Sequence, residues 1–123
     1  MQYILLLYAQ ESGYGTLSEA EKASWWAKIN AYNDALVKGG HYKHTSGLTS
    51  PGTAKTLTRM NGKLEMVDGP FAETKEQLLG FYVVECRALE EALEIARDLA
   101  KANPGGAYEI RPIAYVQPGG AGR

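Results

Sequence analysis

Two apolar runs that lie far apart in the sequence, Tyr3 to Ala9 and Leu79 to Cys86, most constrain what this chain can fold into. Each run is too short for a buried helix and is rich in residues that favour β-strands. Apolar residues occupy both alternating positions of each run, so both faces of these strands are expected to be covered. A chain of 123 residues is long enough to bury such strands in one domain without disulfides.

Two helices are expected after these strands. Ser18 stands three residues before Glu21, the spacing of a capping box, and Gly39-Gly40 is a typical helix end. Between these two signals, steps of four, three and four residues put one set of side chains on a single helical face: Trp25, Ile29, Tyr32 and Leu36. A second amphipathic helix runs from Leu89 to Ala100. Its start, at Arg87-Ala88, lacks a capping side chain.

The remaining strands are shorter. A Tyr- and Thr-rich stretch predicts a strand over His41 to Leu48. Asn61-Gly62 is a strong hairpin signal between strands Lys55 to Met60 and Lys63 to Val67. Tyr108 to Val116 predicts the last strand.

The order β-α-β-(hairpin)-β-α-β predicts an α+β fold of the ferredoxin-like kind. We expect one domain over residues 1–117 and a flexible C-terminal tail over 118–123. Two helices cover one face of such a sheet, and the pattern indicates that the other face is apolar too, including Ile113 and Tyr115. A second copy packed sheet against sheet is the favoured cover, and a long loop folded over that face is the alternative.

Composition excludes several classes of function. The formal net charge of -1 predicts no direct binding to nucleic acid and no attraction to an anionic membrane surface. The single Cys86 excludes an internal disulfide and a multi-cysteine metal site. No secretory leader and no membrane-spanning run is recognisable, so we expect a cytoplasmic protein. No phosphate loop or nucleophile elbow is present, and no cofactor is expected.

The segment from Val67 to Gln77 is dense in ionisable groups between two apolar strands. Asp68-Gly69-Pro70 predicts a turn, and Phe71 is expected to anchor the loop in an apolar pocket. One interpretation is structural, with Asp68 forming the turn and the following charges solvated. The other is functional, with this loop contributing binding residues: Phe71, Glu73, Thr74 and Lys75.

Asp68-Gly69-Pro70-Phe71 followed by Ala72 to Glu76 resembles the signature of the DGPF-domain proteins, a branch of the YCII-related family. The opening strand, Gly80-Phe81-Tyr82, Glu91-Ala92 and Glu109 to Pro112 are also similar to the family's motifs, so the resemblance covers nearly the whole chain. It implies a dimeric α+β barrel with a cleft between the sheet and the dimer partner. Some relatives resemble small enzymes acting on lactones. Others occur beside or fused to alternative sigma factors, which implies a regulatory association.

The sequence departs from that family at one place. Where the family often has Gly-Glu-x-Leu, this chain has Thr45-Ser46-Gly47-Leu48, with Ser46 in place of the acid. If that acid has a catalytic role in the family, either this chain lacks the role or His44 substitutes for the acid. Ser46 is a candidate binding residue, and so is Tyr82, whose hydroxyl suits a mostly apolar pocket.

The two histidines, His41 and His44, are three apart on a predicted strand and therefore point to opposite faces, so no metal site is expected. A single histidine beside Asp68 suits proton transfer, although a surface role is equally open. Arg59 and Arg111 either pair with carboxylates, Asp68 and Glu109 respectively, or bind a substrate carboxylate.

Two functions follow from these residues. The first is a homodimeric module that binds a small molecule or a protein partner in a dimer-associated cleft. The alternative is a cofactor-independent isomerase or lyase acting on a small carbonyl or lactone substrate. In that enzyme Asp68 or His44 would move a proton, and Arg59 or Arg111 would stabilise negative charge. Burial of Asp68 against a histidine or arginine would favour the enzyme, whereas an exposed loop would favour the module.

Overall fold

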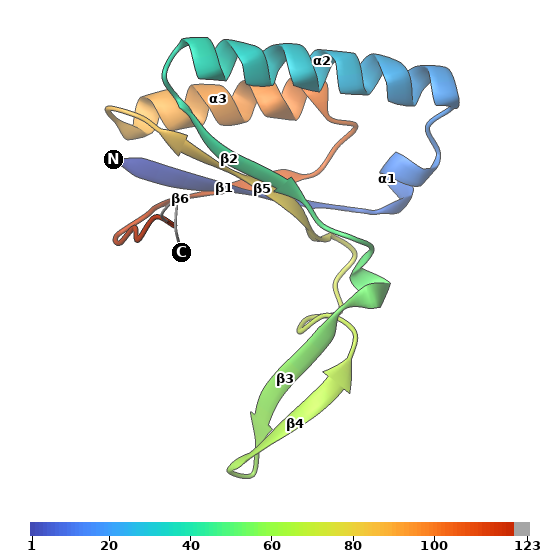
Figure 1. Cartoon of the computed structure of the whole chain (residues 1–123). Helices are drawn as coiled ribbons and strands as arrows, with labels where there is room; N and C mark the ends of the chain where they lie inside the picture. Colours follow the sequence, from blue (N-terminus) through green and yellow to red (C-terminus); the bar gives the residue numbers. More distant parts are fainter. Residues whose placement is uncertain (120–123) are drawn as a thin grey trace.

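The computed structural model describes residues 1–119 and has the expected order of elements (Figure 1). The strands and helices, in chain order, are β1 (Gln2–Ala9), α1 (Ser12–Gly15), α2 (Glu19–Lys38), β2 (Tyr42–Gly47), the 3-10 turn η1 (Pro51–Thr53), β3 (Lys55–Met60), β4 (Lys63–Asp68), β5 (Gln77–Glu85), α3 (Leu89–Ala102) and β6 (Ala107–Pro112). The short helix α1 was not predicted from the sequence. Residues 120–123 of the expected tail lie outside the described part of the chain.

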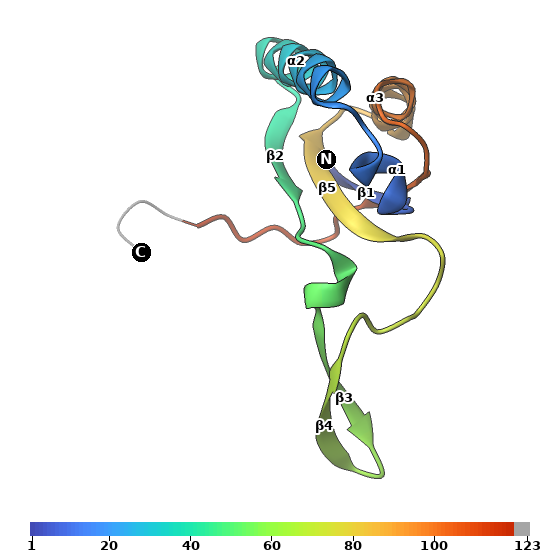
Figure 2. The same ribbon diagram turned by 90° about the vertical axis from the view of Figure 1, so that its right-hand side faces the viewer.

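Four strands form one antiparallel sheet in the order β2-β5-β1-β6. The two long apolar strands β1 and β5 occupy the centre of the sheet. Because these strands carry apolar side chains on both faces, both faces of the sheet centre need to be covered. The fold is therefore α+β with an antiparallel sheet, and its strand order is consistent with the expected ferredoxin-like arrangement. Helices α2 and α3 both lie on one face of the sheet (Figure 2).

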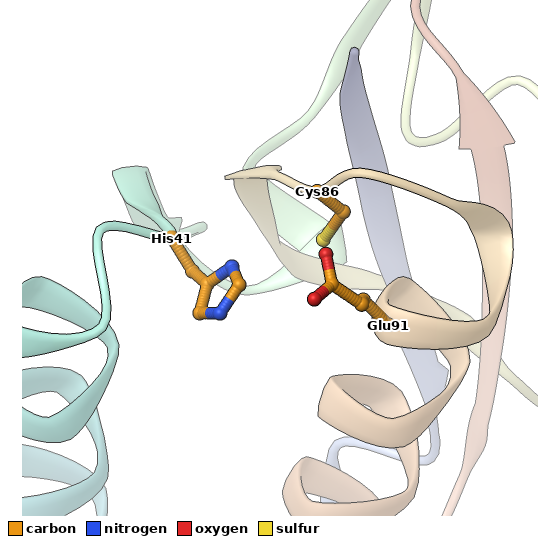
Figure 3. Close-up of side chains that lie close together, drawn as sticks. All are labelled: His41, Cys86 and Glu91. Carbon is orange, nitrogen blue, oxygen red and sulfur yellow. The ribbon is translucent and has the colours of Figure 1, made fainter.

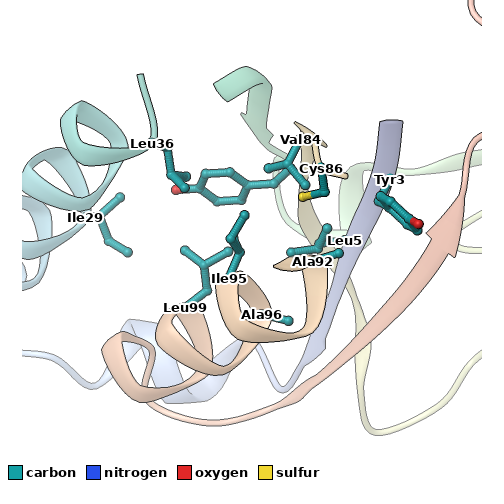
Figure 4. Packing of buried hydrophobic residues seen from close by; sticks show 11 residues of the cluster. Tyr3, Leu5, Ile29, Leu36, Val84, Cys86, Ala92, Ile95, Ala96 and Leu99 are labelled. Carbon is teal, nitrogen blue, oxygen red and sulfur yellow. The ribbon is translucent and has the colours of Figure 1, made fainter. Parts of the chain in front are cut away.

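The core lies between that face and the two helices (Figure 4). Leu5, Val84 and Leu99 are its largest fully buried side chains. The predicted face of α2 is confirmed: Ile29 and Leu36 are buried, and Trp25 and Tyr32 pack against the same cluster. Three further signals are also confirmed, namely the capping box of Ser18 and Glu21, the left-handed closing residue Gly40 and the absence of a side-chain cap on α3.

Strands β3 and β4 form a separate two-stranded sheet that projects from the rest of the molecule (Figures 1 and 2). We call residues 55–68 the arm. The predicted Asn61-Gly62 turn closes it, with both residues at positive φ. Leu57 pairs with Met66 and Arg59 pairs with Leu64, so these four side chains share one face of the arm.

The last strand is shorter than expected. We predicted Tyr108 to Val116, but β6 ends at Pro112, and the last bond to β1 is donated by the Ile113 N–H to the Gln2 carbonyl. The reason is that β1 begins at Gln2, so β6 has no partner strand beyond this point. Ile113 and Tyr115 therefore do not extend the sheet.

The helix-free face of the sheet is consequently apolar only along its centre. The register places Ile4 and Leu6 of β1 beside Val83 and Phe81 of β5 on this face. Polar side chains flank this stripe on the two edge strands: His44 and Ser46 on β2, and Glu109 and Arg111 on β6. Within the described residues, no helix has the length and apolar character required to cross a membrane.

Candidate functional site

A cavity of about 530 Å³ lies between α2 and the sheet, on the side of the core that faces α1 and the base of the arm. The N-terminal half of α2 contributes Trp25, Trp26 and Ile29, and β5 contributes the floor from Leu79 to Tyr82. The end of β2 and the segment that follows it, from Thr45 to Ser50, form another wall. The lining is largely apolar, and its volume is typical of sites for small organic molecules.

Two glycines face each other in the floor of this cavity. Gly47 of β2 pairs with Gly80 of β5, and both line the cavity. A Cβ atom built on Gly47 would meet nothing within 4 Å, so the backbone there borders open space. A Cβ atom on Gly80 would instead lie 2.8 Å from the Ser46 carbonyl oxygen. The missing side chains at this pair therefore create room and allow β2 to approach β5 closely.

Apart from Glu11, the polar groups among the described residues that line the cavity are neutral. Burial raises the pKa of Tyr14, Tyr82 and Tyr108 above the ordinary value for a phenol. These hydroxyls therefore stay protonated at neutral pH and can both donate and accept hydrogen bonds. The Tyr82 hydroxyl donates to the Asn33 Oδ1 at 2.6 Å. Glu11 is the charged residue of the lining, and it is exposed to solvent.

The side chain of Asn103, directly after α3, forms hydrogen bonds with three aromatic residues that line the cavity. Its Oδ1 accepts hydrogen bonds from the Trp25 indole N–H at 3.1 Å and from the Tyr14 hydroxyl at 3.2 Å. Its Nδ2 donates to the Tyr108 hydroxyl at 2.7 Å and to the Leu99 carbonyl at 2.8 Å. One amide group thus joins α1, α2, α3 and β6 around the cavity.

Replacing Asn103 by alanine is expected to lower the free energy of unfolding by about 2 kcal/mol, because it leaves the Trp25 N–H and two hydroxyls without their partner. Urea unfolding checks the stability, and the tryptophan emission maximum should shift to longer wavelength as Trp25 gains contact with water. Asn30→Ala, an exposed site on the same helix as Trp25, is the control and should change neither quantity appreciably. Equal behaviour of the two variants would contradict the role given to Asn103.

Only part of the predicted site lies at this cavity. Ser46 and Tyr82 line it. His44 is bonded to Ser46, with 2.6 Å between Nε2 and Oγ, and its ring stacks on Phe81 with centroids 5.6 Å apart, on the helix-free face. His44 and Arg111 lie in one row across the sheet but on its opposite edge strands, so the structure does not bring them together.

Asp68 and Arg59 lie on the arm, away from the cavity. One of the two interpretations of Arg59, an ion pair with Asp68, is wrong, because the antiparallel register puts Lys55 opposite Asp68, with Nζ 2.6 Å from Oδ1. Both partners of that ion pair are largely exposed. Glu109 and Arg111 share one face of β6, but no ion pair of residues 1–119 joins them.

The loop after the arm is exposed. Phe71 was expected to fill an apolar pocket, but 84% of it is accessible, since the loop leaves the arm without packing on the sheet. Glu73, Thr74 and Lys75 are also exposed, and Gln77 donates from Nε2 to the Ala72 and Thr74 carbonyls to hold the loop's shape. An exposed loop is what we expect if the protein is a binding module, so the exposure of this loop agrees with that hypothesis.

The most important cavity residues were not predicted as a site. Tyr14, Asn33, Asn103 and Tyr108 come from four separate elements, and no local spacing relates them. The one available signal was the tryptophan pair. Because adjacent helical residues point in different directions, one of Trp25 and Trp26 had to lie off the core, and Trp26 is indeed mostly exposed while Trp25 is half-buried.

A four-stranded antiparallel sheet with helices on one face, a ligand-sized apolar cavity between the layers and a projecting two-stranded arm define a small α+β protein with an internal pocket. The chain belongs to the YCII-related family, whose domain matches residues 1–117. It is 42% identical over 120 residues to an uncharacterised protein of Rhizobium meliloti (strain 1021), and the match covers 97% of each chain. The resemblance seen in the sequence is therefore confirmed.

A solved structure, that of a Bacillus cereus protein related to NIF3, is similar with a TM-score of 0.40 and 14% sequence identity. The match covers 93% of this chain and 26% of the other, so this chain spans about a quarter of that protein's length. A similarity of this size carries no argument about function.

Proposed function

We propose that this protein is a homodimeric small-molecule-binding protein whose ligand is a neutral, largely aromatic molecule held in the cavity between α2 and the sheet. The observation that carries the proposal is the cavity itself, about 530 Å³ in volume, with Trp25 and Trp26 in its wall. Aromatic and apolar side chains favour a flat apolar ligand, and the few hydrogen-bonding groups fix its orientation.

The charge of the lining selects against anions. Within residues 1–119, no lysine or arginine lines the cavity, whereas the exposed Glu11 does. An anionic ligand would lose its hydration without gaining a positive partner, which is costly in an apolar site. A ligand hydroxyl or carbonyl can instead pair with the Tyr82 or Tyr14 hydroxyl, which burial keeps protonated by raising the pKa of each.

Binding is better supported than catalysis. A general acid or base must lie within hydrogen-bonding reach of its substrate. Asp68 and Arg59 are on the arm, while His44 and Arg111 occupy the other face of the sheet. Of the predicted binding residues, Tyr82 and Ser46 line the cavity, although the register puts the Ser46 side chain on the helix-free face with His44; none of the predicted catalytic residues is part of the lining.

The neutral probe 2-naphthol is expected to bind and to shift the indole N–H resonances of both tryptophans in a two-dimensional NMR spectrum, because both line the cavity. The anionic analogue 2-naphthalenesulfonate, with the same ring system, should bind at least about tenfold more weakly. Gly47→Val fills open space in the floor and should abolish 2-naphthol binding without unfolding the protein. Gly52→Val, in the η1 turn outside the cavity lining, is the matched control.

Unshifted indole resonances in the wild-type protein, or unchanged binding in Gly47→Val, would overturn the proposal. Tighter binding of the sulfonate would refute the neutral ligand class while leaving a site in place. Circular dichroism of both valine variants establishes that lost binding does not reflect lost structure.

Dimerisation is supported by two apolar surfaces that are not fully buried. The centre of the helix-free face carries Ile4, Leu6, Phe81 and Val83, which are each half-buried. The arm presents Leu57, Leu64 and Met66 on one face, each more than half accessible. A lone two-stranded hairpin is marginally stable in water, so an arm of this kind gains most from packing against another chain. A second copy of the chain, related by a two-fold axis, covers the helix-free face and the apolar face of the arm at the same time.

A further inference from the structure

Three side chains with different metal-binding atoms lie close together (Figure 3). They lie where β2 begins and β5 ends, whereas the cavity is lined by the end of β2 and the start of β5. His41 directly precedes β2, Cys86 directly follows β5, and Glu91 lies in the first turn of α3. One ligand atom from each, namely a ring nitrogen, the thiol sulfur and a carboxylate oxygen, lies within 4.8 Å of the other two. None of the three residues lines the cavity.

We propose that His41, Cys86 and Glu91 form a binding site for a divalent transition-metal ion of the zinc class, with a fourth coordination position open to water. The sequence alone suggested no metal site, because the two histidines point to opposite faces of the sheet. The structure shows that His41 finds its companions on other elements, at the ends of β5 and α3.

One ring nitrogen of His41 is already hydrogen-bonded, which leaves the other for a metal. The His41 Nδ1 lies 2.8 Å from the Glu85 carbonyl oxygen. A carbonyl can only accept, so Nδ1 carries the proton and donates it. The Nε2 lone pair of His41 is then available to a metal, as in many metal-binding histidines whose second ring nitrogen is bonded to a carbonyl.

The cysteine supplies a ligand that has no other polar role. Cys86 is only 3% exposed, and no hydrogen bond described for residues 1–119 includes its sulfur. Metal binding replaces the thiol proton: the S–H bond breaks, the proton leaves to solvent and the thiolate electron pair forms the S–metal bond. No oxidation or reduction takes place in this step.

The carboxylate is held in position by its neighbour Arg87. The Glu91 Oε1 accepts from the Arg87 backbone N–H at 2.6 Å, and Oε2 accepts from the guanidinium at 3.0 Å. The Arg87 Nε also donates to Oε2, at 3.3 Å, so Oε1 is the carboxylate oxygen that keeps a lone pair for a metal. A thiolate and a carboxylate together neutralise a divalent ion. His41 and Glu91 are both partly exposed, which leaves a route for the ion and for a water ligand.

Ligand chemistry and spacing point to zinc or cobalt rather than to magnesium or calcium. Zinc and cobalt prefer nitrogen and sulfur ligands, whereas magnesium and calcium prefer oxygen ligands alone. In a tetrahedral zinc site the ligand atoms are about 3.3 to 3.7 Å apart, given bonds of about 2.0 to 2.3 Å. Shifts of about 1 Å in the two partly exposed side chains would bring the present cluster to that spacing.

Titration of the untagged protein with Co²⁺ tests this site, because a thiolate bound to Co²⁺ gives a near-ultraviolet charge-transfer band. We expect this band to saturate at one ion per chain, and Zn²⁺ to displace the cobalt. His41→Ala and Cys86→Ala should each weaken Co²⁺ binding at least about tenfold, and Cys86→Ala should remove the charge-transfer band. His44→Ala is the matched control, since His44 lies on the other face of the sheet, and it should bind as the wild type does.

Binding should also weaken as the pH falls, because protons compete with the metal for the Cys86 thiolate and burial raises the pKa of this thiol. A wild-type protein without the band would overturn the proposal, as would a loss of binding in His44→Ala equal to that in His41→Ala. Circular dichroism identifies any variant that has unfolded, and Glu91→Gln provides an independent test if Cys86→Ala does so. The metal site and the cavity share no residue, so either can fail while the other holds.

Discussion

Replacing Gly80 by alanine is expected to lower the free energy of unfolding by about 2 to 3 kcal/mol, a large effect for one added methyl group. The new Cβ would lie 2.8 Å from the Ser46 carbonyl oxygen and 3.4 Å from the Gly47 Cα. These are backbone atoms of the paired strand, so no side chain can rotate away. Either β2 moves away from β5, or the new methyl group remains in a steric clash with the backbone of β2.

The same substitution should weaken ligand binding, because β2 continues into the wall of the cavity at Leu48, Thr49 and Ser50. The matched control is Gly47→Ala, on the opposite strand of the same pair, where the added Cβ meets nothing within 4 Å. Its stability should stay within about 0.5 kcal/mol of the wild type. Urea unfolding measures both variants, and equal stability of the two would refute the close approach of the strands at Gly80.

The sequence was sufficient to predict the elements whose signals are local. The capping box of Ser18 and Glu21, the Asn61-Gly62 turn and the apolar face of α2 are each determined by residues close together in the chain. All three were confirmed. The end of β6 was not predictable in this way, because it depends on where β1 begins.

The candidate sites depend on contacts between distant parts of the chain, and sequence reasoning accordingly found only part of them. Asn103 becomes important because Tyr14 and Trp25 reach it from 89 and 78 residues away. His41 meets Cys86 across the end of the sheet. Asp68 stood out in the sequence as part of a charged segment, but local charge density did not reveal that its partner is Lys55. The role proposed for Asp68 in catalysis stays a prediction.

The arm gives the sharpest test of the proposed dimer. Leu57 is 65% exposed and pairs with Met66, which is 67% exposed, and Leu64 lies on the same face. Burying one such side chain contributes about 1.5 to 3 kcal/mol, and in a two-fold dimer each contact occurs twice. A lysine at position 57 would lose this contribution and place a charge in the interface. Leu57→Lys is therefore expected to weaken dimerisation at least about a hundredfold.

Thr58→Lys is the control for that variant, because it introduces the same side chain on the other face of the same strand, beside Glu65. In sedimentation velocity at micromolar concentration, the wild type and Thr58→Lys should both run as dimers while Leu57→Lys runs as a monomer. A monomeric wild type would show that the apolar face of the arm does not pair two copies of this chain. A dimeric Leu57→Lys would show that the helix-free face of the sheet holds the dimer without the arm. If the arm and the helix-free face together form the interface, the wild type is a dimer and Leu57→Lys is a monomer.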